Sequence, residues 1–168
     1  MSQRCECECE YDCDECCCEK KYGKPTRTLL KCGCPGFVAF PVATLIGTTR
    51  TIATLPINTS ELERPCIQLS FSANIYTSVT SGYSFQIFKQ CSDQLTPTPV
   101  SGVYEYSRAV ATTETDTFNF TVCDCDCDSC MDGCCTYLVV VTVTVIPTLD
   151  QYIGTTLSAI ITDNGCGC

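Results

Sequence analysis

The stretch CIQLSFSANIYT, residues 66–77, alternates apolar and polar side chains from Ile67 to Ile75. Every second position is apolar: Ile67, Leu69, Phe71, Ala73 and Ile75. The positions between them are polar: Gln68, Ser70, Ser72 and Asn74. Because successive side chains of a strand point to opposite faces of a sheet, this pattern predicts a strand with one face in the core and the other in water.

The same alternation recurs along the chain, in YSFQIF (83–88), TDTFNFTV (115–122) and TYLVVVTVTVI (136–146). No stretch of comparable length keeps a helical period, and Gly, Pro, Asn and Ser separate the runs. We therefore predict nine strands, near residues 26–32, 36–46, 49–55, 66–77, 82–91, 102–111, 115–123, 135–146 and 154–163.

Many strands joined by short turns, with no helices between them, indicate antiparallel pairing in an all-β sandwich or barrel. Eight or nine strands in a body of this size are best accommodated by a jelly-roll sandwich. The body is predicted to span residues 25–164, after a cysteine-rich N-terminal arm of residues 1–24. A Cys/Asp loop at 123–135 interrupts the body, and a short tail at 165–168 ends the chain.

Composition excludes several functions. The formal charge of −9 argues against nucleic acid and anionic membranes as partners, because both require clustered Lys and Arg. The longest strongly apolar run, Tyr137–Ile146, is too short to cross a bilayer. The 168 residues contain no histidine, which removes the usual general base of nucleophilic catalysis. We therefore expect no enzyme, and we assign no catalytic residue, cofactor or metal ligand.

Cysteine is concentrated outside the predicted core strands. Of the 19 cysteines, seven lie in the arm and six in the Cys/Asp loop. Extended backbone turns the thiols of a C-x-C pair to one face with parallel Cβ vectors, so each sulfur needs a partner on another segment. The alternate residues are acidic, Glu6, Glu8 and Glu10 in the arm and Asp124, Asp126 and Asp128 in the loop, and we expect these faces to be solvated.

The arm is long enough to reach a neighbouring molecule, since full extension would put Cys5 about 60 Å from Lys24. An odd number of cysteines also prevents complete oxidation within one monomer. Both observations favour intermolecular disulfides, although a leftover free thiol would satisfy the parity equally well. The candidates are Cys5, Cys7, Cys9, Cys13, Cys16, Cys17, Cys18, Cys32, Cys34, Cys123, Cys125, Cys127, Cys130, Cys134, Cys135, Cys166 and Cys168.

Two cysteines outside this set, Cys66 and Cys91, stand at the ends of predicted strands, as buried thiols or as one internal bridge. The competing hypothesis for the clusters is metal binding or storage by cysteine thiolates, because Cys13/Cys16 and Cys127/Cys130 are C-x-x-C pairs. Such pairs arise by chance in regions this rich in cysteine, and metal storage would leave the large β body without a purpose.

The motifs LLKCG, PCIQLSFSANI, YSFQIFKQC, VYEYSR, TDTFNFTVCDCDCDSC and TLSAIITD follow one another between residues 29 and 163. In this string the chain resembles a family of uncharacterised cysteine-rich proteins from anaerobic spore-forming bacteria. Its plan, a β body with an N-terminal cysteine arm, is similar to that of the endospore appendage (Ena-type) pilins. That resemblance implies jelly-roll subunits that pair edge to edge with copies of themselves, with N-terminal connectors that form disulfides to neighbouring subunits.

Cellular location follows from the same resemblance. No signal peptide is visible at the acidic N-terminus, yet dense cysteine is typical of oxidising surroundings. A pilin-like subunit made inside a mother cell and oxidised after lysis would reconcile the two observations. The sequence therefore predicts a self-assembling, disulfide-cross-linked filament subunit, extracellular or on the spore surface, in which the arm bonds to the 123–135 loop or to Cys32 and Cys34 of a neighbour.

Overall fold

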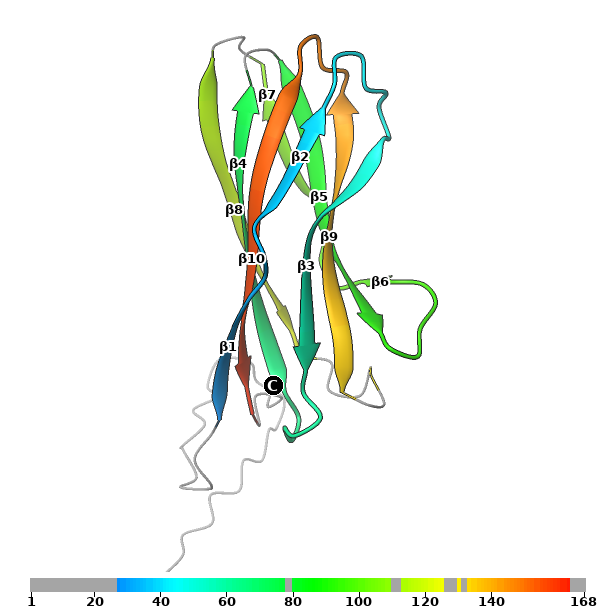
Figure 1. Ribbon diagram of the computed structural model, residues 1–168, viewed down its shortest axis with the longest axis vertical. Helices are drawn as coiled ribbons and strands as arrows, with labels where there is room; N and C mark the ends of the chain where they lie inside the picture. The colour runs from blue at the N-terminus through cyan, green and yellow to red at the C-terminus, as the bar shows by residue number, and fades with distance from the viewer. Residues whose placement is uncertain (1–26, 78–79, 110–112, 126–129, 131–132, 164–168) are drawn as a thin grey trace, which may run out of the picture.

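A computed structural model of the chain describes residues 27–77, 80–109, 113–125, 130 and 133–163. These residues form ten strands and no helix, which confirms the all-β prediction (Figure 1). The predicted arm and C-terminal tail, with Cys127, lie outside the described residues.

The first sheet contains five strands, and its central members are long. β10 (Gln151–Thr162) and β4 (Cys66–Thr77) run side by side, and β8 (Glu114–Asp124) pairs with the far edge of β4. At the other edge two short strands, β1 (Thr28–Cys32) and β2 (Gly36–Phe40), pair one after the other with β10. All of these pairs are antiparallel.

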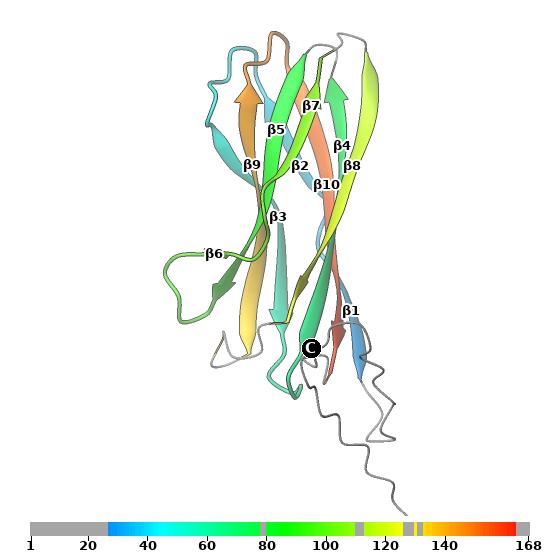
Figure 2. The same cartoon turned by 180° about the vertical axis from the view of Figure 1, so that it is seen from behind.

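The second sheet has the order β3 (Thr49–Asn58), β9 (Cys134–Val145) and β5 (Ser81–Cys91). Its outer edge is divided between β7 (Tyr104–Arg108) and the two-residue β6 (Thr98–Pro99), which both pair with β5 (Figure 2). From β2 to β10 the chain changes sheet at every connection except β5–β6–β7. This is the jelly-roll arrangement, and it confirms the predicted β-sandwich.

Each of the nine predicted ranges overlaps a strand, and β6 is the strand that sequence reasoning missed. The range 36–46 was too long, since β2 ends at Phe40 and Pro41 opens a turn. The range 49–55 was too short, because β3 continues to Asn58 beside β9.

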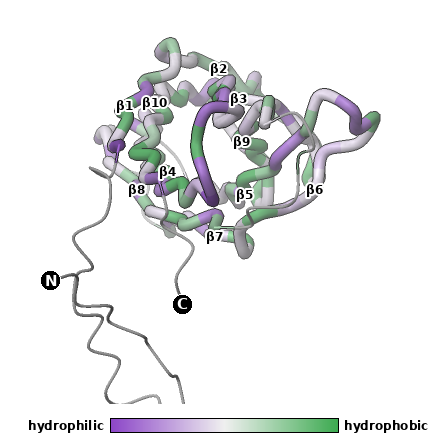
Figure 3. Tube along the Cα trace, turned by 90° about the horizontal axis from the view of Figure 1, so that it is seen from below, coloured by the Kyte–Doolittle hydropathy of each residue, from purple (hydrophilic) through white to green (hydrophobic). Residues whose placement is uncertain are grey.

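The core lies between the two sheets and follows the predicted alternation. Figure 3, which looks along the sandwich, shows β1, β10, β4 and β8 on one side of it and β3, β9 and β5 on the other. In β4 the apolar set from Ile67 to Ile75 is buried, and the residues between are exposed or half-buried. Aromatic rings join the layers: Phe71 of β4 lies 5.5 Å from Phe85 of β5, measured between ring centroids, and Phe118 of β8 lies 5.1 Å from Phe85.

Close packing of backbone requires a glycine where β2 passes over β3. A Cβ on Gly36 would lie 2.0 Å from the carbonyl oxygen of Ile52 and 2.6 Å from Oγ1 of Thr155. The Thr155 hydroxyl donates a hydrogen bond of 2.7 Å to that same carbonyl. The first sheet therefore contacts the second through backbone at this point, and only glycine fits.

Polar contacts close the opposite side of the sandwich, between β7 and β8. The guanidinium of Arg108 contacts Glu114 at 2.6 Å and Asp116 at 3.0 Å, and the hydroxyl of Tyr106 donates to Asp116 at 2.5 Å. Further along the same two strands, Tyr104 stacks on Phe120, with ring centroids 4.0 Å apart. The two sheet edges are thus held together although they are not hydrogen-bonded as strands.

The described chain begins and ends at the same end of the sandwich, where the amide of Asp163 donates to the carbonyl of Arg27 at 2.9 Å. The β3–β4 loop lies there too, because the amide of Thr59 donates to the carbonyl of Gly133. The connection between β8 and β9 leaves from this end (Figure 1). We call it the cysteine end; the loops 41–48 and 146–150 form the opposite end.

Candidate functional site: the cysteine end

Two disulfides attach the segment after β8 to both sheets. Cys125, directly after β8, is bonded to Cys66 at the start of β4, with Cα atoms 4.2 Å apart. Cys130 is bonded to Cys91 at the end of β5, with Cα atoms 5.4 Å apart. The bonds span 59 and 39 residues of sequence. Closing loops of this length in the unfolded chain costs conformational entropy, so the two bonds stabilise the folded body.

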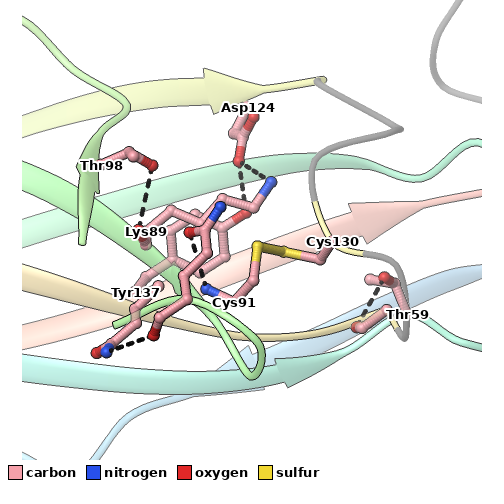
Figure 4. Close-up of a disulfide and its surroundings, with 10 residues drawn as sticks. Thr59, Lys89, Cys91, Thr98, Asp124, Cys130 and Tyr137 are labelled. Atoms are coloured by element: carbon pink, nitrogen blue, oxygen red, sulfur yellow. Dashed lines mark hydrogen bonds and ion pairs between the residues drawn. A yellow bond between two sulfur atoms is a disulfide. The ribbon is translucent and has the colours of Figure 1, made fainter. Parts of the chain in front are cut away.

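A buried polar cluster lies beside these bonds, between the sheets (Figure 4). The ammonium of Lys89 on β5 is 2.9 Å from Oδ2 of Asp124 on β8, and the two side chains are 7% and 6% exposed. The hydroxyl of Tyr137 on β9 donates to the same oxygen at 2.6 Å. Burial and the contact with Asp124 raise the pKa of Tyr137 far above its usual value, so the hydroxyl remains a donor.

Asp124 therefore departs from the prediction that the loop carboxylates are solvated. The alternation itself holds, but Asp124 has the same strand parity as Val122 and points inward, while Cys123 is exposed. A buried carboxylate needs a partner, and Lys89 supplies one from the other sheet.

On the second sheet, the inward-facing residue pair next to Lys89 and Tyr137 consists of two cysteines. Cys135 of β9 lies directly opposite Cys91 of β5, just as Tyr137 lies opposite Lys89. Cys135 is free and buried. Burial raises the pKa of its thiol, while the nearby Lys89 ammonium and the Tyr137 hydroxyl lower it. Lys89, Cys91, Cys135 and Tyr137 thus form one inward-facing block, and Asp124 contacts it from β8.

The remaining described candidates are spread over the surface. Cys32, on the outer face of β1, Cys34, in the break between β1 and β2, and Cys123, on β8, are exposed and free. Cys134 is half-buried and lines a surface hollow of about 420 Å³ with Asn58, Gln90 and Thr136. The structure does not bring these thiols together.

Cys125 and Cys130 were expected among the thiols that bond to a neighbouring copy, and in the structure both have partners in their own chain. The reason is spatial: the start of β4 lies beside Cys125, and the end of β5 lies beside Cys130. The single internal bridge considered for Cys66 and Cys91 is replaced by two separate bridges. The other candidates, Cys5, Cys7, Cys9, Cys13, Cys16, Cys17, Cys18, Cys127, Cys166 and Cys168, lie outside the described residues.

Sequence reasoning missed Lys89 and Tyr137, although a signal was present. In SGYSFQIFKQC (81–91), Lys89 shares its parity with Tyr83, Phe85 and Ile87, all of them buried. A lone Lys on an apolar face predicts a buried cation and therefore a buried acid nearby.

Within the described part of the chain, no three Cys, Asp or Glu side chains gather closely enough to hold a metal ion. That part also contains no helix long and apolar enough to span a membrane.

Strand order and packing make this protein a jelly-roll β-sandwich, and the solved structures that resemble it share the fold at low sequence identity. Those of infectious bursal disease virus strains Gx and Gt each match at 11% identity over 84% of this chain and 33% of the viral chain, with TM-scores of 0.52 and 0.53. The VP2 subviral particle of the same virus matches at 11% identity over 83% and 33%, with a TM-score of 0.50. This chain spans about a third of those viral chains, so the likeness concerns the fold alone.

A search among curated proteins found no match. The sequence family of the chain, by contrast, is shown by a family model. Residues 26–162 match the family model described as "Domain of unknown function (DUF4489)", and the chain belongs to that family.

Proposed function

We propose that this protein is a structural subunit, not an enzyme, that assembles with copies of itself into a disulfide-cross-linked filament outside the cell or on the spore surface. The observation that carries the proposal is the segregation of cysteine. The described residues form a core and two internal disulfides of their own, and seven of the 19 cysteines lie in the N-terminal segment of residues 1–24.

The sheet edges support pairing between copies. Among the described strands, β8 pairs only with β4, and β3 pairs only with β9. Each is ten or more residues long, which is enough for a neighbouring strand to add to the sheet. Addition that does not close into a ring gives an open helical fibre.

The two ends of the sandwich also differ in a way that favours end-to-end association. The end opposite the cysteines carries exposed apolar side chains, Val42, Leu45, Ile46, Ile146 and Leu149. Its two loops are joined by hydrogen bonds from the amide of Ala43 to Pro147 and from the amide of Val42 to Asp150. Clustered exposed apolar side chains are typical of contact surfaces between proteins.

The proposal is tested by comparing the full chain with a chain that lacks residues 1–24, after oxidation. We expect the full chain to give a ladder of covalent oligomers on non-reducing electrophoresis that collapses with reductant, and fibres that resist heat and detergent. The truncated chain should fold, with both internal disulfides formed, and give no covalent ladder. Truncated fibres that are equally resistant would contradict the role of the arm.

Metal analysis of the same preparations separates the proposal from thiolate metal storage. Zinc or copper released in stoichiometric amount from a reduced, monomeric full chain would overturn the proposal that the protein is a structural subunit. In the described residues Cys130 is already bonded to Cys91, so the Cys127/Cys130 pair does not offer two thiolates in this state.

A further inference from the structure

Three cysteines are brought together where the second sheet ends at the cysteine end, two by strand register and two by a disulfide. Cys91 closes β5, Cys135 lies opposite it on β9, and Cys130 follows from the 123–135 loop to bond Cys91. Cys91 and Cys135 are only 2% and 6% exposed. Cys91 therefore has one partner through its bond and a second candidate partner through its strand register.

The register puts Cys135 within reach of Cys91. Directly opposite residues of an antiparallel pair have Cβ atoms about 4.5–5.5 Å apart. A disulfide needs Cβ atoms about 3.5–4.5 Å apart, so a small adjustment of the two strand ends suffices. Cys91 is the last residue of β5 and Cys135 the second residue of β9, and strand ends generally open more easily than the centre of a sheet.

The groups around Cys135 act on its thiolate in both directions. Burial and the carboxylate of Asp124 disfavour the thiolate, as does the neighbouring Cys134. The Lys89 ammonium and the Tyr137 hydroxyl favour it. The Lys89 ammonium would stabilise the negative charge once the proton has left. The Tyr137 hydroxyl has one proton, which it donates to Asp124 in the structure, and it would have to turn that proton to the sulfur to add to this stabilisation.

We propose that Cys135 is an internal exchange thiol for the Cys91–Cys130 disulfide. The thiol of Cys135 gives its proton to solvent base, and the thiolate attacks Sγ of Cys91. The Cys91–Cys135 bond forms, the Cys91–Cys130 bond breaks, and its electron pair leaves on Sγ of Cys130, which takes up a proton. One disulfide and one thiol are present before and after, so the step needs neither oxidant nor reductant.

The exchange moves a thiol from a buried strand to the 123–135 loop. Before it, the free thiol is Cys135 inside the sandwich; after it, the free thiol is Cys130, and two neighbouring strands of one sheet are linked instead. This goes beyond the proposed function, because the exchange is a reaction within one chain and occurs whether or not copies assemble.

The test uses the full-length chain with its seven arm cysteines changed to serine, so that the arm cannot compete. Oxidised monomer is incubated at pH 7 and pH 9, quenched in acid, alkylated with N-ethylmaleimide and mapped by mass spectrometry after cleavage at aspartate. We expect alkylated Cys130 and a Cys91–Cys135 cross-link to appear together. Burial raises the pKa of Cys135 above the usual value of a thiol. The initial rate should therefore rise roughly a hundredfold between the two pH values, because the attacking species is the thiolate.

Matched variants assign the reaction to one sulfur. Cys135→Ser should abolish both products, with Cys135→Ala as a second version if the serine chain folds poorly. Cys134→Ser, at the adjacent position, should leave the exchange unchanged.

Alkylation of Cys130 that persists in Cys135→Ser and Cys135→Ala would overturn the proposal. A parent chain in which Cys91–Cys130 remains intact at pH 9 while only Cys135 is alkylated would overturn it as well. Because every readout is taken on monomer, failure here leaves the filament proposal to its own test.

Discussion

The Nζ atom of Lys89 lies 2.9 Å from Oδ2 of Asp124, and this buried contact joins the two sheets of the sandwich at the cysteine end. Asp124 stands one residue before Cys125 and Lys89 two residues before Cys91, so each member of the ion pair is close in the chain to a cysteine of one internal disulfide. The buried ion pair and the two disulfides at this end therefore depend on neighbouring backbone positions.

Removal of one member of the ion pair should be costly. Asp124→Ala leaves the Lys89 ammonium buried without its carboxylate, and we expect the free energy of unfolding to fall by about 3–5 kcal/mol. Replacement of both residues, Lys89→Met with Asp124→Leu, should restore most of this loss because no charge remains to be buried. Denaturant titration without reductant measures both effects.

The exposed pair Arg27–Glu61 provides the control, with an N–O distance of 3.5 Å and side chains 60% and 83% exposed. Glu61→Ala should change stability by less than about 1 kcal/mol, because solvent screens the pair. A cost for Asp124→Ala as small as that for Glu61→Ala would show that the buried pair contributes little.

Two glycines of the first sheet should respond in opposite ways to the same substitution. Gly36→Ala forces a Cβ against the Ile52 carbonyl and should cost about 1–3 kcal/mol or more through displaced backbone. At Gly154 a Cβ meets nothing within 4 Å, and Gly154→Ala should be neutral or stabilise by about 0.5–1 kcal/mol. Thermal unfolding of the two variants side by side checks the packing where β2 crosses β3, and equal melting temperatures would contradict it.

Stability should fall in alkali partly through Tyr106. Burial, with the hydrogen bond to Asp116, raises the pKa of Tyr106 to about 12. An unfolded tyrosine ionises near pH 10, so the folded state holds the proton more tightly, and the resulting stabilisation, fully present below pH 10, is lost as pH rises from 10 to 12. Tyr106→Phe should flatten the decline of stability over that window, measured by denaturant unfolding at each pH. An unchanged slope would show that Tyr106 does not contribute.

The open edge of β8 can be blocked without touching the core. Asn119 and Thr121 are exposed on this strand, and changing both to lysine should leave the monomer folded while hindering strand addition. On the inner strand β4, Ser70 lies opposite Thr121 and Gln68 lies opposite Cys123. Both β4 residues are exposed, and their double lysine variant adds the same charge away from the edge. We expect the critical concentration for fibres to rise about tenfold, or 1.4 kcal/mol, for the edge variant relative to the β4 variant. Equal effects would argue that β8 is not an assembly edge.

The alternating pattern predicted the strands well because the direction of a side chain is a local property of extended backbone. The same parity assigns Lys89 and Asp124 to the inner faces, with Ile87 and Val122, but Lys89 was overlooked and Asp124 was expected to be solvated. The expectation for Asp124 was wrong because it assumed that an acid among cysteines points to water. That assumption holds only where no buried cation can pair with the acid. The short β6 was missed because two residues show no period.

The residues alone determined that this chain is an all-β body with cysteine gathered at one N-terminal segment and one loop, since composition and a period of two are readable position by position. The partners of Cys66, Cys91, Cys125 and Cys130, and the pairing of Lys89 with Asp124, were decided only by the tertiary structure. Those contacts join positions 35 to 59 residues apart in sequence, within the first sheet for Cys66–Cys125 and between the two sheets for Lys89–Asp124. The jelly-roll order that brings them together is set by the packing of the whole core.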